Sequence, residues 1–324
     1  MLKPVLLYLV KGVSLLLAVS VVAFVLINMS PIDPVQVYVG ADAAVSVEQR
    51  EAIAQHWGLN EPPAGRYIAW LGALLKGDFG TSLIYRMPVI DVIAERALSS
   101  LALMAAAWLL AGLIGFALGI LAGAYHGRWP DQMIKSLCLA LTSTPHFWLG
   151  LLLIIIFAVH LQILPAGLAV PAGKLAHEVT LLDRLRHMIL PALTLSIVGL
   201  PAIALHTRQK LTEVLHSDYC LFAFARGLDK WTVIRRHGLR NVLLPALTLQ
   251  FASFAELFGG SVLAEQVFSY PGLGRAAVQA GLQSDVPLLL GITIFSALFV
   301  FIGNSIANAL YGVVNPEIRS SGIG

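Results

Sequence analysis

The sequence predicts an all-α integral membrane protein with six transmembrane helices and an extracytoplasmic loop domain after the first helix. Of its 324 residues, 58% are hydrophobic and only 12% are charged, and the mean hydropathy is +0.81. A soluble domain of this size rarely reaches such values. The apolar residues are gathered in long runs, and a chain in lipid must satisfy its own backbone hydrogen bonds, which favours helices.

Six runs reach the roughly 20 mostly apolar residues that a helix needs to cross the hydrocarbon core. They are residues 5–29, 98–125, 134–159, 189–206, 242–267 and 287–311. The fourth is the weakest because Pro191 and Pro201 interrupt it. The first could instead be a signal peptide, but its length and the lack of a small-residue cleavage site after Met29 favour a span.

The charge distribution predicts that both termini are cytosolic. With the N-terminus inside, the segments on that side hold Lys3, Lys11, Arg128, Lys135, the bases of residues 207–241, and Arg319. The opposite loop, 30–97, carries eight acids and five bases. This asymmetry fits the positive-inside rule. The predicted domains are an N-terminal helix (1–30), an extracytoplasmic loop (31–97), a transmembrane core (98–312) that includes the loop 207–241, and a cytosolic tail (313–324).

Two short helices are expected in the extracytoplasmic loop. Ser46 and Gln49 form a capping box that opens the first helix, and Gly58 would close it. The second should end at Gly77, and its apolar residues fall on one helical stripe: Tyr67, Trp70, Leu71, Leu74 and Leu75.

Residues 218–245, the basic segment, lie between the fourth and fifth runs and must work outside the lipid. The segment carries Arg226, Lys230, Arg235, Arg236 and Arg240. We expect one helix over residues 211–226, a left-handed stop at Gly227, and a second short helix capped by Asp229, with Pro245 at the start of the fifth span. Bases beside a span can simply lie near anionic headgroups. The glycine stop and the capped helix favour a protein partner instead.

Several motifs, in this order and between these spans, resemble one family. They are GLNEP at 58–62, GDFGTS at 77–82, ARGL at 225–228, RRHGLRN at 235–241, LP at 244–245 and EQVFSYPGLGRAAVQA at 265–280. Together they resemble the permease subunits of ABC importers for peptides, nickel and opines, over essentially the whole chain. The resemblance implies a type I importer permease fold in a bacterial or archaeal inner membrane.

That resemblance implies a non-enzymatic permease that takes up solutes delivered by an extracytoplasmic binding protein. The expected partners are a second homologous permease and two ATP-binding subunits, although the residues do not exclude a homodimer. The loop 207–241 would couple ATP hydrolysis to alternating access, through Arg226, Gly227, Leu228, Arg235, Arg236, His237 and Arg240. The family's Glu-Ala-Ala is Leu221-Phe222-Ala223 here, so its acid is missing. Peptides, nickel, metallophores and opines all remain open as cargo.

Two further groups are candidates for the solute path. Glu256 lies within the fifth run, where an ionisable group is costly. It either lines the path with Gly259 and Gly260 or is a buried acid bonded to neighbouring helices. Glu265, Tyr270 and Pro271 lie at the outer end of the same run and would shape an outer gate or a binding-protein contact.

Other classes of protein fit the sequence less well. A secondary transporter driven by an ion gradient, with Glu256 as its cation site, should show an inverted repeat and paired broken helices, and we see no convincing repeat. The histidines show no metal-ligand spacing, and Gly167 to Lys174 lacks the spacing of a phosphate-binding loop. No cofactor, metal or nucleic acid is therefore expected, and ATP must be hydrolysed by a partner.

Overall fold

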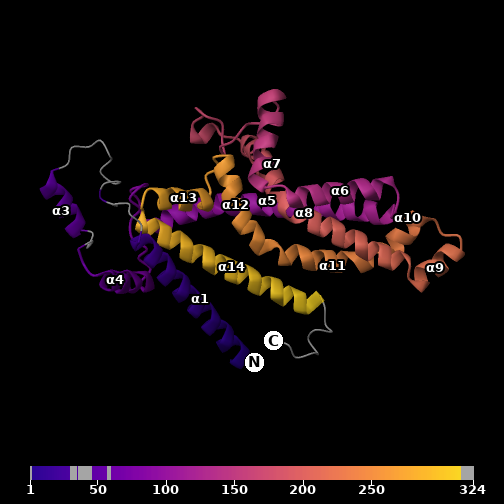
Figure 1. Ribbon diagram of the computed structural model, residues 1–324, viewed down its shortest axis with the longest axis horizontal. Coiled ribbons are helices and arrows are strands. Elements are labelled where there is room, and N and C mark those ends of the chain that lie inside the picture. Colours follow the sequence, from indigo (N-terminus) through magenta and orange to yellow (C-terminus); the bar gives the residue numbers. More distant parts are fainter. Residues whose placement is uncertain (1, 30–34, 36–45, 57–59, 315–324) are drawn as a thin grey trace. The chain divides into compact units, whose positions relative to one another are not determined.

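The computed structural model describes residues 2–29, 35, 46–56 and 60–314, and this part of the chain is helical apart from its connections. The described residues contain one isolated β-bridge, between Thr81 and Pro88. The chain divides into two compact units, residues 1–99 with 272–302 and residues 100–271 with 303–324. Helices α5 (Val89–Ala124) and α14 (Val286–Val314) each contribute residues to both units. Figure 1 labels the helices along the chain.

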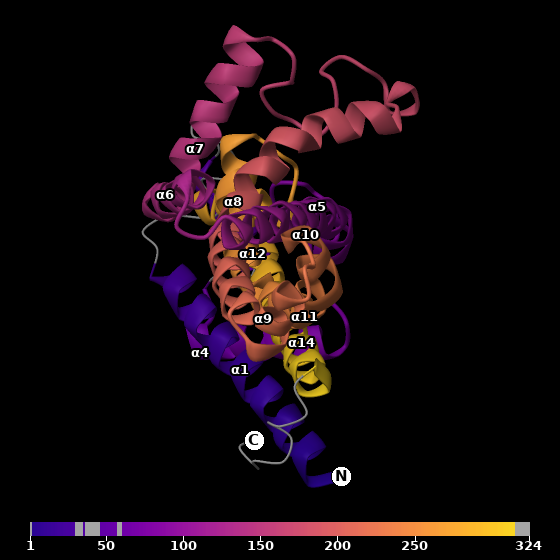
Figure 2. The same cartoon turned by 90° about the vertical axis from the view of Figure 1, so that its right-hand side faces the viewer.

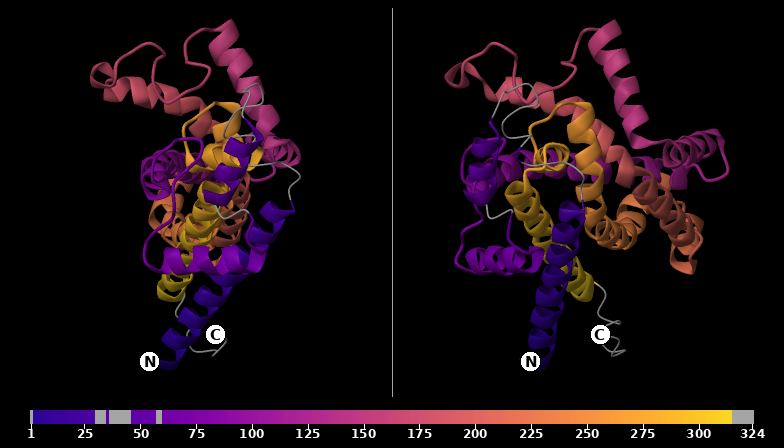
Figure 3. Two further views of the ribbon diagram at one scale, coloured as in Figure 1. Left: turned by 90° about the vertical axis from the view of Figure 1, so that its left-hand side faces the viewer. Right: turned by 60° about the vertical axis from the view of Figure 1, so that its left-hand side comes forward.

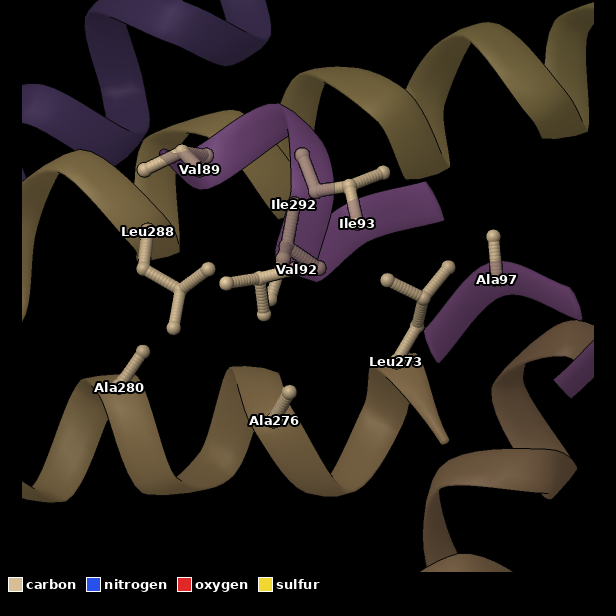
Figure 4. Close-up of a cluster of buried hydrophobic side chains, with 9 residues drawn as sticks. All are labelled: Val89, Val92, Ile93, Ala97, Leu273, Ala276, Ala280, Leu288 and Ile292. Carbon is tan, nitrogen blue, oxygen red and sulfur yellow. The ribbon is translucent and has the colours of Figure 1, made fainter. Parts of the chain in front are cut away.

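The first unit is built around the start of α5, α13 (Leu273–Leu282) and the start of α14. Their buried side chains meet in the apolar cluster of Figure 4, where α13 contributes Leu273, Ala276 and Ala280. Gly291 lets α14 approach α5 closely, since a Cβ there would lie 2.6 Å from a Val89 methyl group. These small residues allow two helices to pack backbone against backbone.

The loop after α1 (Leu2–Asn28) contains the two expected helices, α3 (Val47–His56) and α4 (Pro63–Leu75). The capping box is confirmed, with the Gln49 amide 3.2 Å from Ser46 Oγ and the Ser46 amide 3.3 Å from Gln49 Oε1. Gly58 lies outside the described residues. The stripe of α4 packs on α1 through Tyr67, whose hydroxyl is 2.8 Å from Ser20 Oγ, but Leu75 is 81% exposed.

The second unit packs the remainder of α5 against α8 (Leu181–Leu215). Gly115, Gly119 and Gly123 recur every four residues on α5 and face α8. A Cβ at Gly119 would lie 2.5 Å from Thr207 Cβ and 2.6 Å from the Ala204 carbonyl oxygen. Glycines repeated every four residues let two membrane helices approach closely, and this glycine stripe does so for α5 and α8.

The six predicted spans are partly recovered. Among the described residues, four continuous helices, in α1, α5, α8 and α14, are long and apolar enough to cross a membrane, and two bent helix pairs would raise the number to six. The fourth run, which looked weakest, is a continuous helix with Pro191 and Pro201 inside it. Both prolines are buried by neighbouring helices, which is where membrane helices tolerate them.

The third predicted span is two helices rather than one. α6 (Trp129–Ser143) and α7 (His146–Leu153), which continues as a π-helical segment to His160, meet at 109° (Figure 3, right). Thr144 is extended, with φ −100° and ψ 133°, as a residue before proline prefers. Pro145 therefore ends α6 and begins α7.

The fifth predicted span is also bent. α11 (Leu239–Ala252) and α12 (Phe254–Val267) are joined at Ser253, and the helices on either side differ in direction by 61°. The Ser253 hydroxyl bonds the Gln250 carbonyl at 2.9 Å, a side-chain bond that often bends helices. Contrary to the prediction, Pro245 lies inside α11 and not at the start of a span.

Candidate functional site

The basic segment folds into a compact turn between α8 and α11, at one end of both helices (Figure 1). α9 (Asp218–Ala225) is followed by α10 (Lys230–Val233) and a π-helical segment, Ile234–Gly238, that leads into α11. The single helix expected over 211–226 is wrong in one respect, because α8 ends at Leu215. Ser217 is extended and starts α9, with Asp218 in its first turn, a helix-start signal that sequence reasoning overlooked.

The expected stop and cap of the basic segment are confirmed. Gly227 has φ +84°, the left-handed conformation that ends a helix, and a Cβ there would meet nothing within 4 Å. The Asp229 carboxylate accepts the Thr232 amide at 3.1 Å and the Thr232 hydroxyl at 2.6 Å. The bond from the Thr232 hydroxyl, more than any other cause, holds the pKa of Asp229 below its usual range. Asp229 is therefore charged at neutral pH and stabilises α10.

A buried apolar cluster holds the basic segment on the ends of α5, α8 and α11. Its inward side chains are Cys220 and Ala223 from α9 with Val233 and Ile234, and they pack against Ala124, Leu211, Leu215 and Val242. Gly238 allows close approach, since a Cβ there would lie 3.0 Å from Leu211 Cδ1. Helices α9 and α10 of the basic segment are therefore packed against the end of α8.

Large apolar side chains of the same segment are exposed, on the arms α9 and α10 that face the viewer in Figure 2. Phe222 is 65% exposed, and Tyr219, Leu221 and Trp231 are each about half exposed. The segment also exposes four arginines: Arg226, whose guanidinium lies 6.0 Å from the Phe222 ring centre, and Arg235, Arg236 and Arg240. Within the described chain these last three form no ion pair with an acid. We call this set of eight side chains the basic aromatic surface. Apolar centres with arginine are typical of protein interfaces.

Two of the seven predicted coupling residues have a different position. Leu228 is half-buried against the apolar cluster. His237 is also half-buried, with its ring centre 6.1 Å from that of Tyr219, and its carbonyl accepts the Asn241 amide at 2.8 Å. Leu228 and His237 therefore lie partly beneath the surface, while the arginines and the aromatic side chains are exposed on it.

The candidates on α12 lie on two faces. Glu256 and Gly259 are exposed, three residues apart, and Leu263 continues the same face at 47% exposure. Within the described chain the Glu256 carboxylate has no hydrogen bond or ion pair. In this single chain Glu256 is therefore not a buried acid bonded to neighbouring helices, which was one of the two alternatives. Gly260 instead faces α8, where a Cβ would lie 3.0 Å from Leu195 Cδ1.

The candidates at the end of α12 and in the turn that follows it are mostly buried. Glu265 is fully buried and accepts the Ser100 hydroxyl at 2.6 Å, and Tyr270 is 6% exposed. Pro271 is half-buried. The turn that follows α12 is bonded to the loop of residues 161–180, because the Phe268 carbonyl accepts the Leu168 amide at 2.8 Å. The neighbouring Gly167 carbonyl lies 2.7 Å from His187 Nδ1 of α8. Within the turn, the Tyr270 amide donates to the Glu265 carbonyl at 2.9 Å.

Three buried polar contacts were not expected from the sequence. Asp131 pairs with Arg208, Asp285 accepts the Ser82 hydroxyl at 2.6 Å and the Ile84 amide at 3.0 Å, and the Trp108 indole donates to the Gln250 carbonyl at 2.9 Å. Asp285 joins Ser82 of the GDFGTS motif to the start of α14. No group of three or more metal-binding side chains gathers in the described residues.

The fold and the site together define a class of protein. A sequence model of the family described as binding-protein-dependent transport system inner membrane component matches residues 115–320, and the chain belongs to this family of ABC importer permeases. The match covers α6 to α14 and includes the whole basic segment. A membership of this kind implies a solute-binding protein and ATPase subunits as partners.

Named relatives cover almost the full chain. It is 35% identical over 309 residues to the oligopeptide transport system permease protein AppB of Bacillus subtilis (strain 168), covering 95% of this chain and 96% of the relative. It is 36% identical over 305 residues to the glutathione transport system permease protein GsiC of Escherichia coli (strain K12), covering 94% of each. The chain is also 36% identical over 320 residues to the glutathione transport system permease protein GsiC of Salmonella typhimurium, covering 98% of this chain and 99% of the relative.

Proposed function

We propose that this protein is one of two related permease subunits of an ATP-driven importer and that it takes up peptides. The peptide cargo rests on the names of the relatives, which are permeases for oligopeptides and glutathione. Nickel, metallophores and opines are the alternatives. The second permease, a pair of ATPase subunits and an extracytoplasmic binding protein complete the complex, and both termini lie in the cytosol.

One observation carries this proposal: the basic aromatic surface is exposed, and a buried apolar cluster lies beneath it. Its aromatic side chains are half to two-thirds exposed, while Cys220, Ala223, Val233 and Ile234 beneath it are buried on the ends of α8 and α11. A surface that only held the topology near lipid headgroups would need no such support. The surface docks an ATPase subunit, and the rigid support transmits the movement of that subunit to the helices.

The proposed mechanism is alternating access. Closure of the ATPase dimer on ATP pushes the basic segment, which moves with α8, and the solute path then opens from the outer to the inner side. Glu256 and Gly259 line this path, because an unpaired carboxylate at membrane depth must face water or a partner and not lipid. Glu265, Tyr270 and Pro271 shape the outer gate.

The test is association with the ATPase subunits. The combined variant Arg235→Ala, Arg236→Ala and Arg240→Ala removes three exposed cations without touching the buried cluster, so the permease should fold normally. We expect its ATPase subunits to be lost on co-purification, with association weakened by about tenfold or more. Lys135→Ala, an exposed base of α6 on the same predicted side, is the control and should retain them. An intact complex with full transport in the triple variant would contradict the proposed docking surface.

A further inference from the structure

The connection between α5 and α6 contacts the basic segment from the side. We call residues 125–131 the α5–α6 turn. Its Tyr125 ring centre lies 5.5 Å from Lys230 Nζ and 6.4 Å from the Trp231 ring centre. Both partners belong to α10, the second arm of the basic segment. A movement of this arm therefore meets the α5–α6 turn directly.

A buried ion pair fixes the α5–α6 turn to α8. Asp131 is 2% exposed and accepts two bonds from the Arg208 guanidinium, one from Nε and one from Nη2 at 2.8 Å, together with the Gly127 amide at 2.8 Å. Arg208 Nη2 also lies 3.2 Å from His126 Nδ1. Because two parallel bonds join planar groups, the pair fixes an orientation as well as a distance.

The same ion pair fixes the start of α6, since Asp131 lies in the first turn of that helix. α6 packs further along α5 and α8, where Ile134 and Cys138 meet Ala122 and Ala204. Removing either partner would leave a buried charge without its counter-ion, which proteins tolerate poorly. The start of α6 is therefore fixed to α8, near the end of α8 that leads into the basic segment.

Beyond the bend at Pro145, α6 is followed by α7 (Figure 3, right). α7 packs against the C-terminal end of α12. A Cβ at Gly150 of α7 would lie 3.2 Å from Val267 Cγ1, 3.3 Å from Phe268 Cε2 and 3.3 Å from Thr194 Cγ2. Val267 ends α12, and the turn of Glu265 and Tyr270 lies beside it. The bent pair α6–α7 thus connects the basic segment to the far end of the fifth span.

We propose that α6–α7, clamped by the Arg208–Asp131 ion pair, is a second route by which movement of the ATPase-docking surface reaches the outer gate. This inference rests on the proposed function, because it assumes that an ATPase pushes the basic segment. Arg208 and Asp131 are positioning residues in this scheme. They touch neither solute nor ATPase, and they make α6 turn together with α8 instead of slipping along it.

The experiment uses the complete complex in proteoliposomes and measures both ATP hydrolysis and peptide uptake. In Arg208→Ala we expect the ATPase subunits to remain bound and ATP hydrolysis to stay within about twofold of wild type, while uptake per ATP hydrolysed falls about tenfold. Lys210→Ala is the matched control, because Lys210 lies two residues further along α8 and makes an exposed pair with Glu213. It should leave uptake per ATP unchanged.

Two further variants protect the test against misfolding. The exchange Asp131→Arg with Arg208→Asp restores an ion pair and should recover most of the lost uptake per ATP. Arg208→Lys keeps the charge but not the paired bonds and should lie between wild type and Arg208→Ala. Wild-type uptake per ATP in Arg208→Ala, or an exchange variant that assembles but recovers nothing, would overturn the inference. Failure of the wild-type permease to bind ATPase subunits would instead contradict the proposed function.

Discussion

At the scale of single residues, Gly227 and Asp229 decide the shape of the basic segment. Gly227 ends α9 with φ +84°, and two residues later Asp229 starts α10 by binding the Thr232 amide. Both roles could be predicted from the sequence, because a left-handed stop and an N-cap are local properties. The exposure of Phe222 and the burial of Cys220 could not, since they depend on which face of α9 meets α8.

Gly227→Ala should weaken the coupling segment without any clash. Nothing lies within 4 Å of a Cβ at this position, so the penalty is the left-handed backbone alone, about 1 kcal/mol. We expect a small loss of thermal stability and reduced recovery of ATPase subunits. Gly227→Asn should be milder, because asparagine adopts this conformation more readily. Equal behaviour of the two variants in a thermal unfolding and co-purification assay would show that the backbone conformation is unimportant.

At the scale of elements, small residues and prolines explain where the sequence-based spans succeeded and failed. Long apolar runs correctly identified α1, α5, α8 and α14. The apolar runs did not predict the bends at Pro145 and Ser253, because apolar composition continues through both positions. The helix direction changes there by 109° and 61°. Conversely, Pro191 and Pro201 suggested a weak span, but packing against neighbouring helices keeps α8 continuous. Local residues caused the two bends, whereas tertiary packing kept α8 continuous.

The glycine stripe of α5 offers a prediction about helix packing. Gly119→Ala places a methyl group 2.5 Å from Thr207 Cβ and 2.6 Å from the Ala204 carbonyl, so α5 and α8 must separate. Overpacking of this kind costs about 1–3 kcal/mol. We expect a lower midpoint of thermal unfolding in detergent. Gly72→Ala on α4, where a Cβ has nothing within 4 Å, should leave the midpoint unchanged or slightly raise it. A tolerated Gly119→Ala would contradict the packing of α5 on α8.

At the scale of the whole molecule, the motifs of the sequence are sufficient to predict the family. The motifs of the basic segment, the GDFGTS loop and the turn after α12 fall on connections between helices and on the helix ends beside them. The buried pairs Arg208–Asp131 and Ser82–Asp285 could not be predicted, because their partners are 77 and 203 residues apart. Such contacts come from the folded topology, and one of them supplies the route through α6–α7.

The most direct test of the central claim is peptide uptake into proteoliposomes that hold this permease with its related permease, ATPase subunits and binding protein. Uptake is measured with ATP and no ion gradient, and again with a proton or sodium gradient and no ATP. An ATP-driven permease predicts accumulation only with ATP, and its loss when the ATPase cannot hydrolyse the nucleotide. Accumulation driven by the gradient alone, abolished by Glu256→Gln, would contradict the account and favour a secondary transporter.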